Sequence, residues 1–82
     1  MDGRVSEELN GRLKAEFVKL NKEFFDNLIG DYDVRFARKS VRTHGSINFH
    51  RKKIRVSLPL YEQHGWEPVR QTLIHEMTHA LI

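Results

Sequence analysis

The sequence contains no cysteine, no long apolar run and no repeated or low-complexity segment. Without cysteine, neither a disulfide bond nor a thiolate zinc site can form. A membrane-spanning helix needs roughly eighteen or more consecutive apolar residues, and no window provides them. The charged N-terminus also lacks the apolar core of a secretion signal. These absences predict one small soluble domain with a cytoplasmic location and no membrane partner.

Positive charge is concentrated in the middle of the chain, although the formal net charge is only +3. Residues 31–56 contain two aspartates and eight basic residues, whereas residues 57–82 contain one arginine against three glutamates. The basic residues are Arg35, Arg38, Lys39, Arg42, Arg51, Lys52, Lys53 and Arg55. Such a section suits a surface that attracts nucleic-acid phosphates, and it is equally typical of a solvated strand face.

Residues 6–28 carry the pattern of an amphipathic helix. Ser6 can cap its N-terminus, and Asn27 to Gly30 provide a stop signal. Apolar residues recur at steps of three and four, which is the spacing of one helical face. These residues are Leu9, Leu13, Phe17, Leu20, Phe24 and Leu28. We therefore expect a first helix that packs this stripe in the core and carries no chemistry.

Residues 32–58 change to a period of two, which predicts strands. Apolar and polar residues alternate in three short runs, centred near Val34, Ile47 and Val56. Arg51-Lys52-Lys53 separates the second run from the third, a spacing short enough for an antiparallel hairpin. A longer basic loop joins the first two runs. We expect a three-stranded antiparallel sheet with its apolar face packed on the first helix.

The C-terminal section predicts two more helices. Pro59 precedes a short helical turn that ends at Gly65, and Trp66 is expected to anchor the next helix in the core. Glu67-Pro68 starts a longer helix, because proline suits the first helical position. Its apolar face consists of Leu73, Ile74, Met77, Ala80 and Leu81. The predicted fold class is therefore α+β, with an N-terminal helix, a three-stranded antiparallel sheet, a short helix and a final helix.

The final helix contains an HExxH motif, His75-Glu76-Met77-Thr78-His79. Two histidines four residues apart lie on the same helical face, so both imidazoles can reach one metal ion. Glu76 is turned off that axis and can sit over a metal-bound water. The motif predicts Zn²⁺ bound by His75 and His79, with Glu76 as the general base. The alternative is two surface histidines on a core helix without metal.

A catalytic zinc site needs three protein ligands and an open position for water. The motif supplies two of these ligands. Within this chain, the possible third ligands are His44, His50, His64 or a carboxylate, and each of them can equally be an ordinary polar residue. Two histidines alone would hold zinc weakly.

These residues resemble the SprT-like metalloprotease domain of bacterial SprT proteins, related archaeal proteins and metazoan Spartan proteases. The most specific stretch is residues 72–81, Thr-Leu-Ile-His-Glu-Met-Thr-His-Ala-Leu, which is very close to the Spartan form. The helix around residues 20–25 and the strands around residues 32–36 and 54–57 also fit. The resemblance covers nearly the whole chain.

The resemblance implies a zincin-like fold and a zinc metalloendopeptidase in which His75 and His79 bind the metal and Glu76 is catalytic. It also implies a protein substrate, with DNA as a possible partner, because Spartan-type members degrade proteins crosslinked to DNA. In the family, the third zinc histidine lies downstream of the motif helix. We therefore expect residues 1–82 to be a single SprT-like domain that is incomplete at its C-terminus and largely inactive alone. The apolar residues 80–82 are then expected to be exposed and to self-associate.

The sequence is compatible with three functions. The first is a zinc metalloprotease domain that acts in DNA–protein crosslink repair, at the nucleoid or in the nucleus. The second is a non-catalytic nucleic-acid-binding module that uses the eight basic residues of the middle section. The third is a folding fragment without activity of its own.

Overall fold

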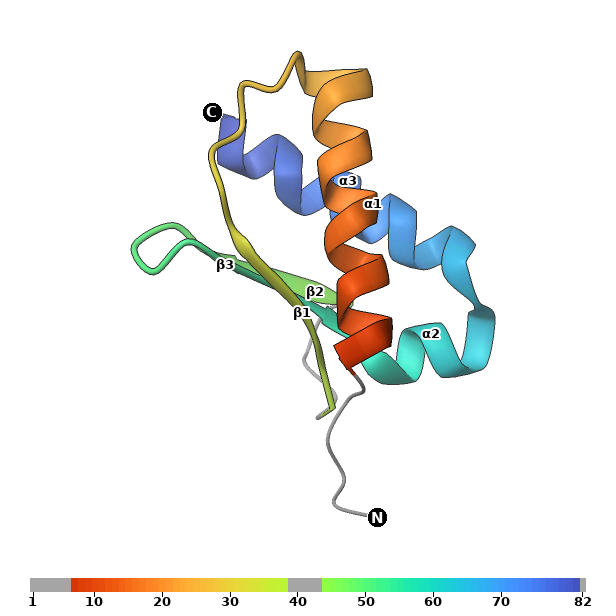
Figure 1. The fold of residues 1–82 in the computed structure, drawn as a ribbon. Helices are drawn as coiled ribbons and strands as arrows, with labels where there is room; N and C mark the ends of the chain where they lie inside the picture. Colours follow the sequence, from red (N-terminus) through yellow and green to blue (C-terminus); the bar gives the residue numbers. More distant parts are fainter. Residues whose placement is uncertain (1–6, 39–43, 82) are drawn as a thin grey trace.

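The structure is a computed structural model that describes residues 7–38 and 44–81. In chain order, its elements are α1 (Glu7–Phe25), β1 (Asp33–Ala37), β2 (Gly45–Asn48), β3 (Lys53–Ser57), α2 (Leu58–His64) and α3 (Trp66–Leu81) (Figure 1). This is the α+β fold expected from the sequence. The predicted N-cap Ser6 and the basic residues Lys39 and Arg42 lie outside the described ranges. Within those ranges, no helix is both long and apolar enough to cross a membrane.

The three strands form a mixed sheet in the order β1-β3-β2. β2 and β3 form the expected antiparallel hairpin, in which Ile47 is paired with Ile54. β1 runs parallel to β3, with Val34 opposite Ile54, so the prediction of a fully antiparallel sheet was wrong. The alternating pattern determines which side chains share a face, but it carries no information about strand direction. The last strand in the sequence therefore occupies the centre of the sheet.

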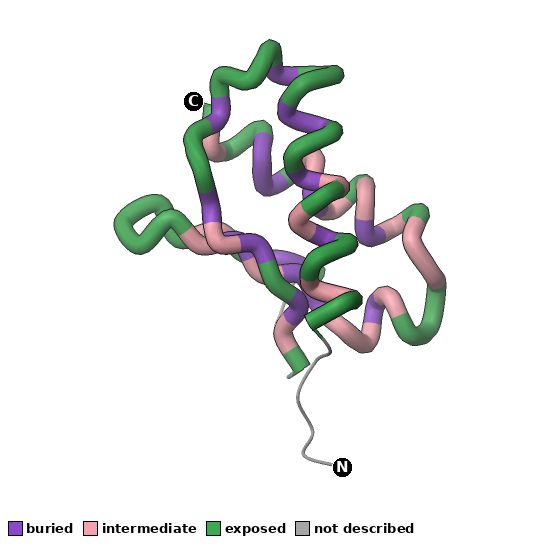
Figure 2. The backbone as a smooth tube through the Cα atoms, viewed as in Figure 1, coloured by how far each residue is buried: buried purple, intermediate pink, exposed green. Residues whose placement is uncertain are grey.

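Both long helices cover the same face of the sheet. α1 packs mainly against β1, and α3 packs against β2 and β3. The covered face carries Val34 and Phe36 of β1 and Ile54 and Val56 of β3, all of them buried. In the described part of the chain, no helix covers the opposite face, and burial alternates along the strands (Figure 2). The core thus lies between the sheet and the two helices.

The apolar stripe predicted for α1 holds for most of the helix and fails at its end. Its buried members are Leu13, Phe17 and Leu20, and Leu9 packs against them from the rim of the core. Phe24 and Leu28, by contrast, are 61% and 69% exposed. The helix ends at Phe25 because the next two residues, Asp26 and Asn27, adopt left-handed backbone angles.

Asn21 fixes the chain reversal that follows α1. It is buried, its Nδ2 donates to the Ile29 carbonyl at 2.8 Å, and its Oδ1 accepts from the Ile29 amide at 3.2 Å. These bonds satisfy the buried side-chain amide. They also hold Ile29 in the core, where the hydrophobic spacing had predicted Leu28.

Residues between β3 and α3 orient the motif helix. The Ser57 hydroxyl caps α2 by accepting from the Leu60 amide at 3.4 Å. Gly65, with φ of 79°, ends α2, and glycine adopts this angle at little cost. Trp66 opens α3 and packs edge-on against Tyr61, with 5.0 Å between ring centroids. At the other end of α3, Leu81 is 45% exposed, and self-association through this end stays a prediction.

Candidate metal centre

His75 and His79 lie one helical turn apart on α3, and both are exposed. Their Nε2 atoms are 3.2 Å apart, and their rings are nearly perpendicular. Two Zn–N bonds of about 2.0–2.1 Å at a tetrahedral angle would place the nitrogens about 3.3 Å apart. The pair therefore fits shared ligation of one zinc ion. The same separation also fits a hydrogen bond between two neutral imidazoles.

Glu76 has a different environment from the two histidines. It is buried, with 7% of its surface exposed. Its carboxylate has no hydrogen-bonding or ion-pairing partner among the residues that the structure describes. The carboxylate oxygens are not among the buried polar atoms without a partner in the described residues, so solvent reaches them. Glu76 thus has the surroundings expected of a reactive carboxylate.

Glu76 and His75 line an open cleft of about 450 Å³ beside the start of β2. The other lining residues are His44, Gly45, Pro68, Gln71 and Thr72. Cavities of this size are common at ligand sites. One of the two histidines and Glu76 therefore border a space that can admit part of a substrate.

Gly45 sets the distance between α3 and β2. A Cβ at this position would lie 2.7 Å from Thr72 Cγ2, 3.1 Å from the Arg55 carbonyl oxygen and 3.5 Å from Glu76 Cγ. Only glycine permits this close approach, which seats Glu76 against the strand. The role of Gly45 was not recognised from the sequence, because the side chains that crowd it come from a distant helix.

We expect Gly45→Ala to destabilise the domain by about 1–3 kcal/mol, the usual cost of overpacking. Adding Thr72→Ser removes the methyl group closest to the new Cβ and should restore part of the lost stability. Gly11→Ala is the matched control, because a Cβ at Gly11 meets nothing within 4 Å. Urea unfolding of the four proteins measures the effect. An unchanged midpoint for Gly45→Ala would mean that α3 can move away from β2 without cost.

The three histidines outside the motif lie in different places. His44 lines the cleft with His75, whereas His50 lies in the β2–β3 turn and His64 at the end of α2. Within the described residues, no three His, Asp or Glu side chains are grouped closely enough to hold a metal ion. As the structure places them, His44, His50 and His64 are therefore not grouped with both motif histidines in the way that a three-ligand site requires.

Two of the predicted basic residues, Arg35 and Arg55, form ion pairs within the sheet. On its open face, Arg35 Nε lies 3.0 Å from Asp33 Oδ1, and Arg55 Nη2 lies 3.1 Å from Asp33 Oδ2. Arg55 also donates to the main-chain carbonyls of Asp33 and Ile54. Burial raises the pKa of the Asp33 carboxyl, but bonds and charges from Arg55 and Arg35 outweigh it and hold that pKa below its usual range.

The remaining described basic residues lie toward the hairpin turn or the end of β1. Arg51 and Lys52 are exposed in the turn, Lys53 is half-buried at the start of β3, and Arg38 is exposed after β1. Lys52 has a left-handed φ of 54°, and its ammonium lies 5.5 Å from the centre of the Tyr32 ring. The structure therefore divides the predicted basic residues between β1, β3 and the β2–β3 turn, and Arg51 and Lys52 are the exposed ones in the turn.

A comparison with known families gives a match over most of the chain. The sequence model of the SprT-like family matches residues 13–82, a range that includes the sheet, the cleft and the whole of α3. Comparisons with curated proteins and with solved structures gave no match. The chain belongs to the SprT-like family, which is of the metallopeptidase type and generally zinc-dependent.

Proposed function

We propose that this chain is the catalytic part of a zinc-dependent metallopeptidase, with His75 and His79 as metal ligands and Glu76 as the general base. The observation that carries the proposal is the arrangement on α3. Two imidazole nitrogens lie 3.2 Å apart beside the buried residue Glu76, whose carboxylate has no partner among the described residues. The same residue borders an open cleft, where a substrate can reach a general base.

Each of the three residues has its own role. His75 and His79 hold the ion through neutral imidazole nitrogens. Zinc in this position acts as a Lewis acid toward a peptide carbonyl and lowers the pKa of water toward about 7. Glu76 takes the proton of the attacking water and delivers it to the leaving amine. Its position on the open cleft supports this role, because the residue borders the space that a substrate would occupy.

The proposal includes a third protein ligand from outside the described residues, which provide two. Following the family resemblance, we propose a histidine downstream of α3. Without that ligand, residues 1–82 are expected to bind zinc weakly and to show little proteolysis.

The test is zinc-dependent hydrolysis of a denatured protein by the intact protein that carries this chain. Cleavage should disappear with a chelator and return when Zn²⁺ is added. A protein that binds one zinc ion per chain and cleaves nothing would instead favour the non-catalytic interpretation of the motif.

A DNA-associated protein is the more specific substrate that we propose. Arg51 and Lys52 are exposed in the β2–β3 turn, which extends away from the helices (Figure 1). Cations at such a position suit contacts with phosphates, which make binding sensitive to salt. A nucleic-acid-binding module without catalysis is the second candidate function, and it depends on the same residues.

Reversing the charge of Arg51 and Lys52 to glutamate should weaken DNA binding. For double-stranded DNA, the salt dependence of the affinity should fall by about one unit of log–log slope for each phosphate that the protein no longer neutralises. Lys19→Glu with Lys22→Glu, on the exposed side of α1, changes the net charge equally and is the control. Fluorescence anisotropy at several salt concentrations measures both variants. If both double variants lost DNA affinity equally, the effect would be due to net charge alone. If the turn variant kept its DNA affinity, the turn would not be part of the DNA interface.

A further inference from the structure

The turn between β2 and β3 carries an exposed aromatic ring together with two cations. The strand pairing ends at Asn48 and Lys53, so the turn consists of four residues, 49–52. Phe49 opens this turn, and 54% of its surface is exposed. Its ring has no contact with another ring or with a cation among the described residues. The core therefore gains little from this phenylalanine, and the ring is free to contact a partner.

Two hydrogen bonds fix the shape of the turn. Within it, Asn48 Oδ1 accepts from the Arg51 amide at 3.0 Å. At its end, the Lys52 carbonyl accepts from the Asp33 amide of β1 at 2.8 Å, and Lys52 has a left-handed φ of 54°. A turn that is held in this way presents Phe49 and Arg51 already in place, which lowers the entropic cost of binding.

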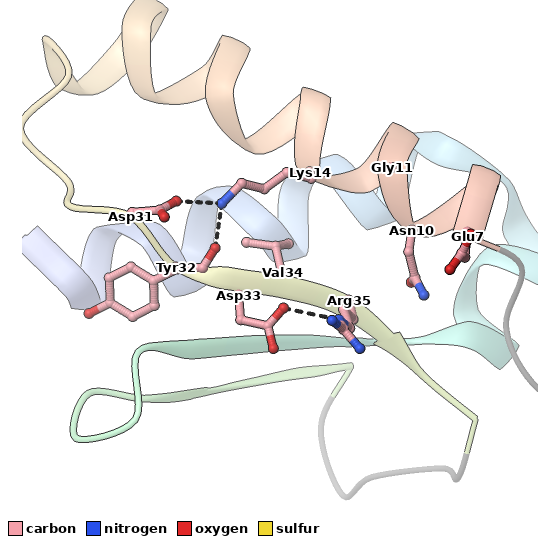
Figure 3. Close-up of a pocket in the computed structure, with 9 residues that line it drawn as sticks. All are labelled: Glu7, Asn10, Gly11, Lys14, Asp31, Tyr32, Asp33, Val34 and Arg35. Carbon is pink, nitrogen blue, oxygen red and sulfur yellow. Dashed lines mark hydrogen bonds and ion pairs between the residues drawn. The ribbon is translucent and has the colours of Figure 1, made fainter.

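The acidic residue that bonds to the turn does not neutralise its cations. Asp33 lines a cavity of about 550 Å³ between α1 and β1, and one of its carboxylate oxygens pairs with Arg35 (Figure 3). The other oxygen pairs with Arg55. Arg51 and Lys52 have no ion pair among the described residues. The turn therefore carries two uncompensated positive charges, which suit a negatively charged partner.

We infer that Phe49 stacks on an unpaired base of a DNA strand whose phosphates contact Arg51 and Lys52. The inference rests on the proposed association with DNA and names the form of DNA that the turn contacts. Stacking on an aromatic side chain needs a free base face, which a single strand offers and the interior of a duplex does not. Every base has such a face, so the contact accepts any sequence.

A membrane surface is the other partner that an aromatic ring beside cations could suit. Phe49 is the only apolar residue among the four residues of the turn. Attachment to a membrane depends on the apolar area that is buried in it, and one side chain supplies little. One ring is, by contrast, a complete platform for one base. The composition of the turn therefore favours the DNA strand.

The experiment measures the binding of three fluorescent DNA probes to the chain by anisotropy at low salt. The probes are an oligothymidine strand, an abasic strand of the same length and a duplex. Phe49→Ala should weaken the binding of oligothymidine about 5- to 150-fold, the effect of losing one stacked base. The other two probes offer phosphates without a free base face, so their affinities should not change. Phe49→Trp should retain the affinity for oligothymidine, and the base should quench its indole fluorescence.

Two further variants separate stacking from general apolar contact. Phe24→Ala is the matched control, because Phe24 is 61% exposed at the end of α1, and it should bind all three probes like the parent chain. Phe49→Leu keeps an apolar side chain without a flat ring and should lose affinity for oligothymidine as Phe49→Ala does.

The inference is overturned if Phe49→Ala binds oligothymidine like the parent chain, if it loses affinity for the abasic strand equally, or if Phe49→Leu keeps full affinity. Binding to phosphatidylglycerol vesicles that requires Phe49, without binding to oligothymidine, would also overturn it. The proposed DNA contact fails separately. If reversing the charges of Arg51 and Lys52 leaves the affinity for the abasic strand unchanged, the turn does not contact phosphates. None of these readouts depends on zinc or proteolysis.

Discussion

Glu76→Gln should abolish peptide hydrolysis and leave zinc binding unchanged. In a zinc-loaded form of the protein that cleaves a denatured substrate, we expect kcat to fall by about 10²- to 10⁴-fold, the usual contribution of general acid–base catalysis. Glutamine keeps the shape of glutamate, so the packing of this side chain against β2 is preserved, but it cannot accept the proton. Steady-state kinetics and metal analysis of the same preparation measure the two quantities.

A second readout of the Glu76→Gln variant needs no substrate. The native carboxylate has no partner among the described residues, so an amide of the same shape removes no hydrogen bond and no ion pair. The variant should therefore unfold at a temperature equal to or higher than the parent chain, as expected where function is maintained at the expense of stability.

Glu67→Gln is the matched control for Glu76→Gln, because Glu67 lies in the first turn of the same helix and is exposed. It removes the same charge by the same change of atoms and should leave cleavage intact. Full activity in Glu76→Gln would exclude this residue from the chemistry. Loss of zinc together with activity would make Glu76 a metal ligand instead of a base.

His79→Ala should remove specific zinc binding from the domain. The Nε2 atoms of His75 and His79 are 3.2 Å apart, and the substitution leaves a single imidazole at this position. A ligand that binds only the folded state stabilises it by about 2.7 kcal/mol when present at 100 times its Kd. In the intact protein that carries this chain, zinc should therefore raise the unfolding temperature, and it should have no effect on the variant. Native mass spectrometry gives the stoichiometry directly.

The control for His79→Ala is His64→Ala, which removes an exposed histidine at the end of α2. It should bind zinc like the parent chain. If His64→Ala lost zinc as well, His64 would be a substitute third ligand. If the His79 variant retained one zinc ion per chain, the pair on α3 would not be the metal site.

The sequence predicts the elements of this fold because burial follows the period of each element. Val34, Ile54 and Val56 alternate with polar residues and are buried, and the spacing of Leu73 and Met77 predicts the buried side of α3. Strand direction could not be predicted in this way. The same residues occupy the covered face whether β1 runs parallel or antiparallel to β3.

The end of α1 could not be predicted for a different reason. Asn21 is polar, yet it is buried there because its side chain bonds both main-chain groups of Ile29. A hydrophobic pattern does not represent such bonds, so it predicted Leu28 in the core.

In the candidate site too, residues placed by local helical spacing could be predicted from the sequence, whereas residues placed by distant contacts could not. The relative positions of His75, Glu76 and His79 follow from helical spacing alone, so the motif could be recognised from the sequence. His44 and Gly45 reach the same cleft only through tertiary packing. No local pattern links them to α3.

The central position of β3 has a consequence for the order in which this protein folds during synthesis. In the described chain, β1 pairs only with β3. Since β3 comes later in the sequence, β1 leaves the ribosome before its partner. The β2–β3 hairpin is a local structure of a kind that forms within microseconds. It can assemble as soon as Lys53–Ser57 has left the ribosome, and β1 then adds to it across a long intervening segment. The sheet therefore grows outward from its last-made strand.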